Sequence, residues 1–169
     1  MKLHNRIIKG EFWTDTEIQC DMDAMNRLLY LGLIQIADDS GCINDDVRAF
    51  KMMLFPGDDI SYTTLEGYRD RLIELGKLLP YEVEGKGCLY IKNFHKHQSL
   101  SQPGPPMVSL PKYLRWVSDP KKYKSGHYEI SVSNTWLKVG ESLANDSDSL
   151  AIDTESIYIP FSSNGLGSG

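Results

Sequence analysis

The chain has 169 residues, of which 41% are hydrophobic, and a formal net charge of −5. This composition is sufficient for a hydrophobic core and excludes a disordered chain. No apolar run reaches the roughly 18 residues of a membrane span, so we expect no membrane partner. The acidic balance excludes a strongly basic nucleic-acid-binding protein, which draws most of its affinity from neutralising phosphates.

The cysteines and the N-terminus indicate a reducing compartment. Cys20, Cys42 and Cys88 are scattered, odd in number and without CxxC spacing, which argues against disulfides and against a zinc site built on cysteine. Residues 1–9 lack the apolar block of a signal peptide. We therefore expect a cytoplasmic protein.

Helical patterns dominate the first third of the chain. Residues 14–17 match a capping box with Thr14 at the N-cap of a short helix. A long helix is predicted from roughly Met22 to Asp38, with a broad apolar face. Gly41 ends it, because glycine readily adopts the left-handed conformation. A minimal strand, residues 42–43, follows.

Two further helices and a hairpin complete this part. Asn44 and Asp45 are predicted to cap a helix that stops at residues 55–57. Residues 63–66, with Thr63 at the N-cap, form a second capping box that starts a third helix, which ends near Gly76. Alternating strands over 78–83 and 88–94 flank a glycine-containing turn at 84–87.

This order of elements predicts the fold class. One helix, a short strand, two helices and a hairpin form the layout of an α+β winged helix-turn-helix, with three main helices and a hairpin wing, over residues 5–98. A Pro/Ser-rich linker is expected over 99–110. A basic-aromatic extension over 111–138 contains a strand-like stretch at 128–132. An acidic, flexible tail is expected over 139–169, so the C-terminal extension is predicted to be only partly ordered.

The third helix presents charge opposite its core face. At about 100° per residue, Leu65, Tyr68, Leu72 and Leu75 fall on one side. Three carboxylates on the other side oppose deep insertion into a phosphate-lined groove, because they are little screened over a few ångströms. They form either a solvated face or a contact face for a basic protein partner. These residues are Glu66, Asp70 and Glu74, with Arg69 and Arg71 on the two shoulders.

Basic residues gather in and after the hairpin. Lys86 lies at its turn, and Lys92 and Lys96 follow, where they are candidates for phosphate contacts. Alternatively, these lysines keep a hairpin soluble and prevent edge-to-edge pairing.

His95 and His97 are weak metal candidates. On an extended chain, alternate residues share a face and can meet one ion, with Cys88 or Glu82 as a third ligand. Solvated histidines are the alternative. Because no phosphate-binding loop or nucleophile elbow is present either, we expect no enzyme, no cofactor and no metal.

Several short sequence segments together resemble a known family. They are residues 6–8, 12–14, 27–33, 37–41, 54–56 and 93–98. In this order they resemble the N-terminal winged-helix domain of phage replication proteins of the replisome-organiser type, over roughly residues 5–106. The resemblance implies a DNA-binding initiation module in phage or prophage replication, in a bacterial host cell.

The resemblance also marks where this chain departs from the family. Members continue into a helical C-terminal domain that contacts helicase-loading machinery, whereas the remaining residues here are few and polar. The matched segments consist mostly of residues with structural roles, so the resemblance identifies no residue that reads a base. The residues expected in the core are Trp13, Leu28, Leu29, Phe55 and Phe94.

Two functional hypotheses follow. The first is non-enzymatic binding of double-stranded DNA in replication initiation. The second is a protein-interaction module, in which Glu66, Asp70 and Glu74 contact replication proteins or a second copy of the chain. The residues predicted to contact DNA are Lys86, Lys92, Lys96, Arg69, Arg71, Lys121, Lys122 and Lys124.

Overall fold

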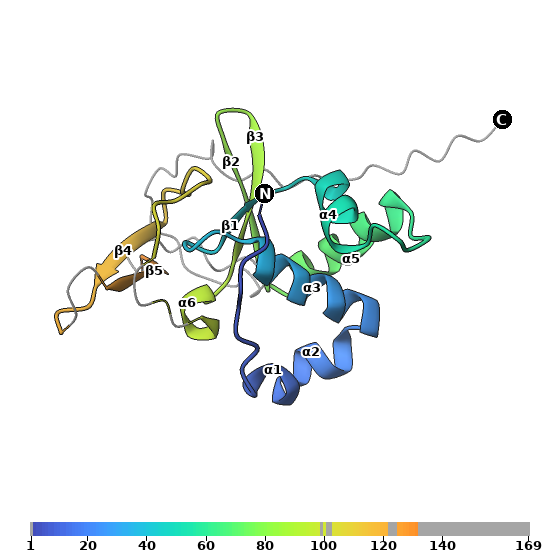
Figure 1. Ribbon diagram of the computed structural model, residues 1–169, viewed down its shortest axis with the longest axis horizontal. Coiled ribbons are helices and arrows are strands. Elements are labelled where there is room, and N and C mark those ends of the chain that lie inside the picture. The colour runs from blue at the N-terminus through green and yellow to red at the C-terminus, as the bar shows by residue number, and fades with distance from the viewer. Residues whose placement is uncertain (1, 99, 101–102, 122–124, 132–169) are drawn as a thin grey trace, which may run out of the picture.

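The computed structural model describes residues 2–98, 100, 103–121 and 125–131. They form a mixed α+β fold with small antiparallel sheets (Figure 1). In chain order the elements are α1 (Glu11–Thr14), α2 (Thr16–Asp21), α3 (Ala24–Ile36), β1 (Cys42–Asn44), α4 (Val47–Leu54), α5 (Tyr62–Glu74), β2 (Leu78–Val83), β3 (Lys86–Ile91), α6 (Phe94–His97), β4 (Leu114–Ser118) and β5 (Gly126–Ile130). Among the described residues, no helix combines the length and apolarity that crossing a membrane requires.

The helices begin one or two residues away from the predicted caps. Asp15, Asp46 and Ser61 are the N-caps of α2, α4 and α5, and their side chains accept backbone amides of the first turn. Thr14 is the last residue of α1, where its backbone is already helical and cannot cap. The other predicted caps are also wrong. Asn44 is the last residue of β1, and the side chain of Asp45 binds Arg69 of α5 instead of an amide of α4. Thr63 lies inside α5.

The first sheet has the strand order β1-β3-β2, with both pairs antiparallel. The hairpin turn is tighter than predicted: Glu84 and Gly85 both have positive φ, 51° and 72°, and Lys86 pairs with Val83. Such a two-residue turn matches the twist of the flanking strands. Strand β3 therefore begins two residues earlier than predicted and also ends earlier, because α6 starts at Phe94.

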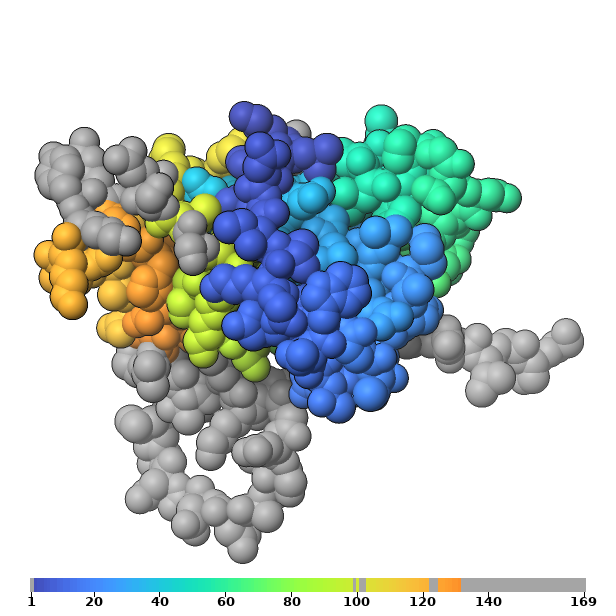
Figure 2. Space-filling model, turned by 60° about the horizontal axis from the view of Figure 1, so that its bottom comes forward, coloured from blue at the N-terminus to red at the C-terminus, as the bar shows by residue number. Residues whose placement is uncertain are grey.

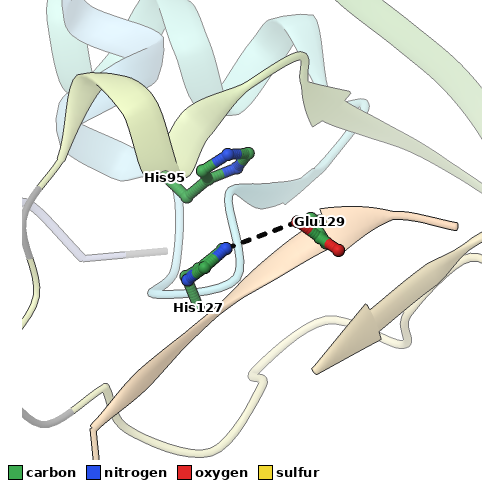
Figure 3. A group of neighbouring side chains, drawn as sticks. All are labelled: His95, His127 and Glu129. Carbon is green, nitrogen blue, oxygen red and sulfur yellow. Dashed lines mark ion pairs between the residues drawn. The ribbon is translucent and has the colours of Figure 1, made fainter. Parts of the chain in front are cut away.

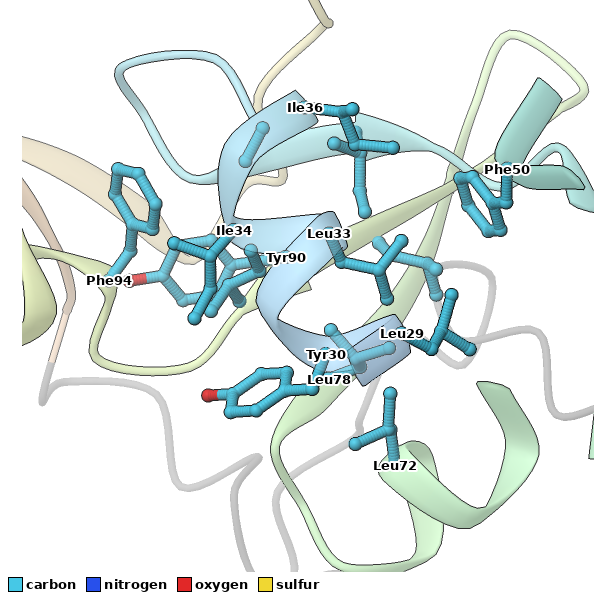
Figure 4. Packing of buried hydrophobic residues seen from close by; sticks show 14 of the residues in the cluster. Leu29, Tyr30, Leu33, Ile34, Ile36, Phe50, Leu72, Leu78, Tyr90 and Phe94 are labelled. Atoms are coloured by element: carbon cyan, nitrogen blue, oxygen red, sulfur yellow. The ribbon is translucent and has the colours of Figure 1, made fainter. Parts of the chain in front are cut away.

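The core lies between α3, α5 and the sheet. Leu29 and Leu33 of α3 are fully buried and face Leu72 of α5 and Leu78 of β2 (Figure 4). Leu65 is likewise fully buried, so the predicted inward face of the third helix is confirmed at Leu65 and Leu72.

Two of the five residues expected in the core lie at the surface. Leu29, Phe55 and Phe94 are buried, but Trp13 and Leu28 are 61% and 50% exposed. Phe12 takes the buried position instead, and the ring of Trp13 packs edge-on against it from outside, with the centroids 5.1 Å apart.

The far side of the sheet is covered by the chain after α6. In Figure 1 the β4–β5 hairpin lies on the opposite side of the three-stranded sheet from α4 and α5. Tyr113 contacts the rings of Tyr81 and Tyr90 edge-on, and Leu114 is buried in the same core. The predicted strand at 128–132 begins earlier, at Gly126, and its last residue lies outside the described residues, as does the tail predicted over 139–169.

A buried carboxylate joins these two parts of the chain. One oxygen of Asp38 accepts the amides of Ser40 and Cys42 and the Ser40 hydroxyl. The other accepts the amides of Met107 and Val108, at 2.9 and 3.2 Å. Together with the bond from Gly104 N to Asp39, these contacts hold the described residues of the expected linker, 99–110, against the loop after α3.

We expect Asp38→Ala to lower the free energy of unfolding by about 3 kcal/mol or more, because it leaves several buried amides without an acceptor. Urea denaturation measures this change. The exposed side chain of Asp59 has no partner in the described part of the chain, and Asp59→Ala serves as the matched control with an expected change within about 0.5 kcal/mol. Equal midpoints for the two variants would contradict the role assigned to Asp38.

We expect Gly41→Ala to destabilise the protein by about 2 to 4 kcal/mol. Gly41 has φ +84°, and an added Cβ would lie 2.6 Å from the Cβ of Phe94. Gly67→Ala is the control, since this glycine lies inside α5 with open space around it; a gain of up to about 1 kcal/mol is expected. Thermal unfolding of both variants measures these changes. An unfolding temperature of Gly41→Ala equal to that of the unmodified chain would contradict the expectation.

Candidate nucleic-acid interface

The outer face of α5 is acidic. Glu66, Asp70 and Glu74 are all exposed, on the side of the helix opposite the buried Leu65 and Leu72. In a helix-turn-helix this is the face that would approach DNA. Here it presents carboxylates, which a phosphate backbone repels.

Arg69 does not offset this charge, because its guanidinium is held inside the protein. Its Nη1 lies 3.0 and 2.9 Å from the two carboxylate oxygens of Asp45, and Asp70 binds the same group. Burial by itself would lower the pKa of Arg69, but the hydrogen bonds and charges of the two aspartates raise it above its usual value. The side chain is only 17% exposed, so it ties α5 to the start of α4.

This ion pair also fixes the hairpin relative to α5. The backbone amide of Asp45 donates to the carbonyl of Gly87, at 3.0 Å, so one residue contacts both the helix and the tip of the hairpin. Arg71, the other shoulder arginine, lies 3.1 Å from Glu74 and is more exposed. Both arginines predicted to contact DNA are therefore partly neutralised by neighbouring acids.

Lys86 is exposed at the hairpin turn and pairs with no carboxylate among the described residues. Glu82 and Glu84, also exposed, lie on the opposite strand and in the turn. The hairpin tip therefore presents a mixed charge pattern, in which one ammonium group competes with two carboxylates.

A groove of about 310 Å³ lies at the other end of the hairpin, between α2, the end of α5 and α6. Lys77 in its wall bonds to Asp15 and Glu17, at 3.0 and 2.7 Å. Burial alone would lower the pKa of Lys77, but these two carboxylates raise it, and the ammonium group is neutralised.

Lys92 and Lys96 also line this groove, and they remain exposed without an ion pair in the described part of the chain. The ammonium group of Lys9 donates to the carbonyl of Lys96, which adds a third cation beside them. Figure 2 shows the N-terminal segment, in dark blue, side by side with α6, in yellow-green. The predicted pair Lys92 and Lys96 is therefore brought together at one site.

The remaining predicted lysines are dispersed. Lys86 and Lys92 lie at opposite ends of β3, about 20 Å apart for an extended strand. Lys121 is exposed after β4, where its amide donates to Asp119. Lys122 and Lys124 lie outside the described residues.

The two histidines of α6 point to different places. The prediction that His95 and His97 share a face is wrong, because residues 94–97 form a helical turn rather than an extended chain. Residues two apart on a helix point about 200° apart. His97 lines the groove, where burial and the nearby charges of Lys77 and Lys9 lower its pKa.

His95 instead meets residues that sequence reasoning missed. His127 and Glu129 of β5 face it across a short gap (Figure 3). Neither Cys88 nor Glu82 belongs to this cluster. The alternation of His127 and Glu129 on a strand was a usable signal that they share a face, but no local pattern linked them to His95.

Comparisons with protein-family models, curated proteins and solved structures find no match for this chain. Its own geometry and charge therefore have to support any functional proposal.

Proposed function

We propose that this chain is a non-enzymatic DNA-binding module of the winged-helix type, acting in phage-type replication initiation. The order α3, β1, α4, α5 and a β2–β3 hairpin, with strand order β1-β3-β2, supports the winged-helix assignment. The role in replication initiation depends on the sequence resemblance of residues 5–106.

One observation carries the DNA proposal: the distribution of neutralised and unpaired cations. Arg69, Arg71 and Lys77 are bound by acids, whereas Lys86, Lys92 and Lys96 remain exposed without a carboxylate partner in the described residues. Unpaired exposed lysines are the groups that exchange counterions for phosphates.

The spacing of these lysines favours an extended polyanion. A ligand that contacts both ends of β3 must span about 20 Å, which corresponds to about six phosphates at 3.4 Å per nucleotide of one strand. Binding through the hairpin and α6 also keeps the acidic face of α5 out of the grooves of the DNA. In this mode the protein contacts the backbone and carries little base specificity.

We expect the full chain to bind DNA with a salt-dependent affinity, and Lys86→Ala with Lys92→Ala to reduce the slope of log K against log salt by about one to two units. Fluorescence anisotropy with duplex and single-stranded DNA, at about 50 to 200 mM salt, measures the slope.

The matched control is Lys86→Arg with Lys92→Arg, which preserves both charges and should preserve the slope. An unchanged slope in the alanine variant would remove the hairpin lysines from the interface. No binding of either DNA at the lowest salt would overturn the DNA proposal itself.

The acidic face of α5 supports a second candidate, a protein-interaction module that contacts replication proteins or a second copy of the chain. Asp70 and Glu74 are engaged with Arg69 and Arg71, but Glu66 has no ion pair among the described residues. Glu66 is therefore the residue whose charge can be changed without disturbing its neighbours.

We expect Glu66→Lys to tighten DNA binding several-fold and to steepen the salt slope by up to about one unit, because it removes a repulsion and adds a cation. Glu66→Gln should give a smaller effect of the same sign. Sedimentation equilibrium is run in parallel. If Glu66→Lys dissociates an oligomer and leaves DNA binding unchanged, self-association through α5 replaces the DNA proposal.

A further inference from the structure

A compact histidine–carboxylate cluster lies where α6 contacts β5, away from the groove lined by Lys77, Lys92 and Lys96, which we call the lysine groove. One potential ligand atom from each of His95, His127 and Glu129 lies within 4.8 Å of the others. The imidazole rings are stacked, with centroids 4.6 Å apart and planes inclined by 26°. Glu129 Oε2 lies 3.5 Å from His127 Nε2, the ion pair drawn in Figure 3.

The surroundings of His95 leave one of its ring nitrogens without a role. Its Nδ1 is buried and has no hydrogen-bond partner among the residues that the structure describes. A cavity of about 20 Å³ adjoins both histidines and is walled by Phe94, Gln98 and Tyr128. That volume accommodates one water-sized occupant.

The surroundings of His95 lower the pKa of its imidazole. Burial lowers its pKa, and the neighbouring His127 and Lys96 lower it further, while Glu129 and the backbone of Tyr128 act in the opposite direction. Only the neutral form of an imidazole has a lone pair that can bind a metal ion.

We propose that His95, His127 and Glu129 bind one divalent transition-metal ion of the Zn²⁺ class. Two imidazole nitrogens and one carboxylate oxygen form the three-ligand set of open zinc sites, which leave a fourth position to water. Imidazole ligands favour zinc, copper or nickel, whereas magnesium and calcium prefer sites made of oxygen alone.

The site requires only a small adjustment to close on an ion. Ligand bonds of about 2.1 Å in a tetrahedron place ligand atoms about 3.4 Å apart, so no separation within the cluster has to shrink by more than about 1.4 Å. The His127 side chain is 41% exposed and is stacked on His95, so part of this adjustment must come from rotation of its ring. Glu129 is already oriented, because its other oxygen accepts a 2.9 Å hydrogen bond from Arg115.

A bound ion would link two distant segments of the chain. One ligand comes from α6 and two from β5, so the ion would fasten the β4–β5 hairpin to the first part of the fold. Anything that binds only the folded state stabilises it by mass action. The inference is independent of DNA binding, because it uses none of the lysines assigned to phosphates.

The test uses the full chain, purified without a histidine tag and stripped of metal with a chelator. Titration with ZnCl₂ by calorimetry should show one ion per chain. At free zinc 100 times the dissociation constant, the unfolding equilibrium constant should fall about 100-fold. His127→Ala should abolish both effects, and MgCl₂ should produce neither.

The matched control is His97→Ala, two residues from His95 on α6 but facing the groove. It should bind zinc as tightly as the unmodified chain. His127 is partly exposed, so its alanine variant is expected to fold, and circular dichroism checks this. The proposal is overturned if the unmodified chain binds no zinc saturably, if folded His127→Ala binds equally well, or if His97→Ala loses binding.

Discussion

The arrangement of this protein depends on the hydrogen bonds that the buried side chain of Asp38 accepts. A buried polar group is costly unless it is hydrogen-bonded, and this side chain accepts bonds from both the loop after α3 and the segment at 107–108. The same carboxylate therefore shapes the entry into β1 and anchors the chain that leads to β4. The β4–β5 hairpin, and with it the position of His127 and Glu129 opposite α6, follows from this anchoring.

Charge is distributed so that an acidic protein retains discrete cationic points. The pair between Arg69 and Asp45 contributes to positioning α5 against α4 and the hairpin, at the expense of a cation on the helix that would face DNA. Lys77 is likewise neutralised inside the groove. Lys86 and Lys92, which the DNA proposal assigns to phosphates, lie at the two ends of β3, which favours backbone contacts over insertion of α5 into a DNA groove.

The short helix α6 separates two different environments within a single turn. His95 faces β5, while His97 faces the lysine groove, because residues two apart on a helix point in nearly opposite directions. The proposed metal site and the proposed phosphate contacts can therefore occupy the two sides of one element without sharing a ligand. Loss of the ion would be expected to loosen the β4–β5 hairpin rather than to remove a lysine from the groove.

The sequence by itself determined the local elements. Periodicity predicted the three longer helices and put Leu65 and Leu72 on an inward face, and the conformational freedom of glycine predicted the left-handed turn at Gly41. Alternation and Gly85 placed the hairpin. Local patterns did not distinguish Phe12 from Trp13, because adjacent aromatic residues fit the same apolar signal. Only the tertiary structure decided the pairs Arg69–Asp45, Asp38–Met107 and His95–His127. These partners are tens of residues apart, and helical or strand periodicity relates only residues two to four apart.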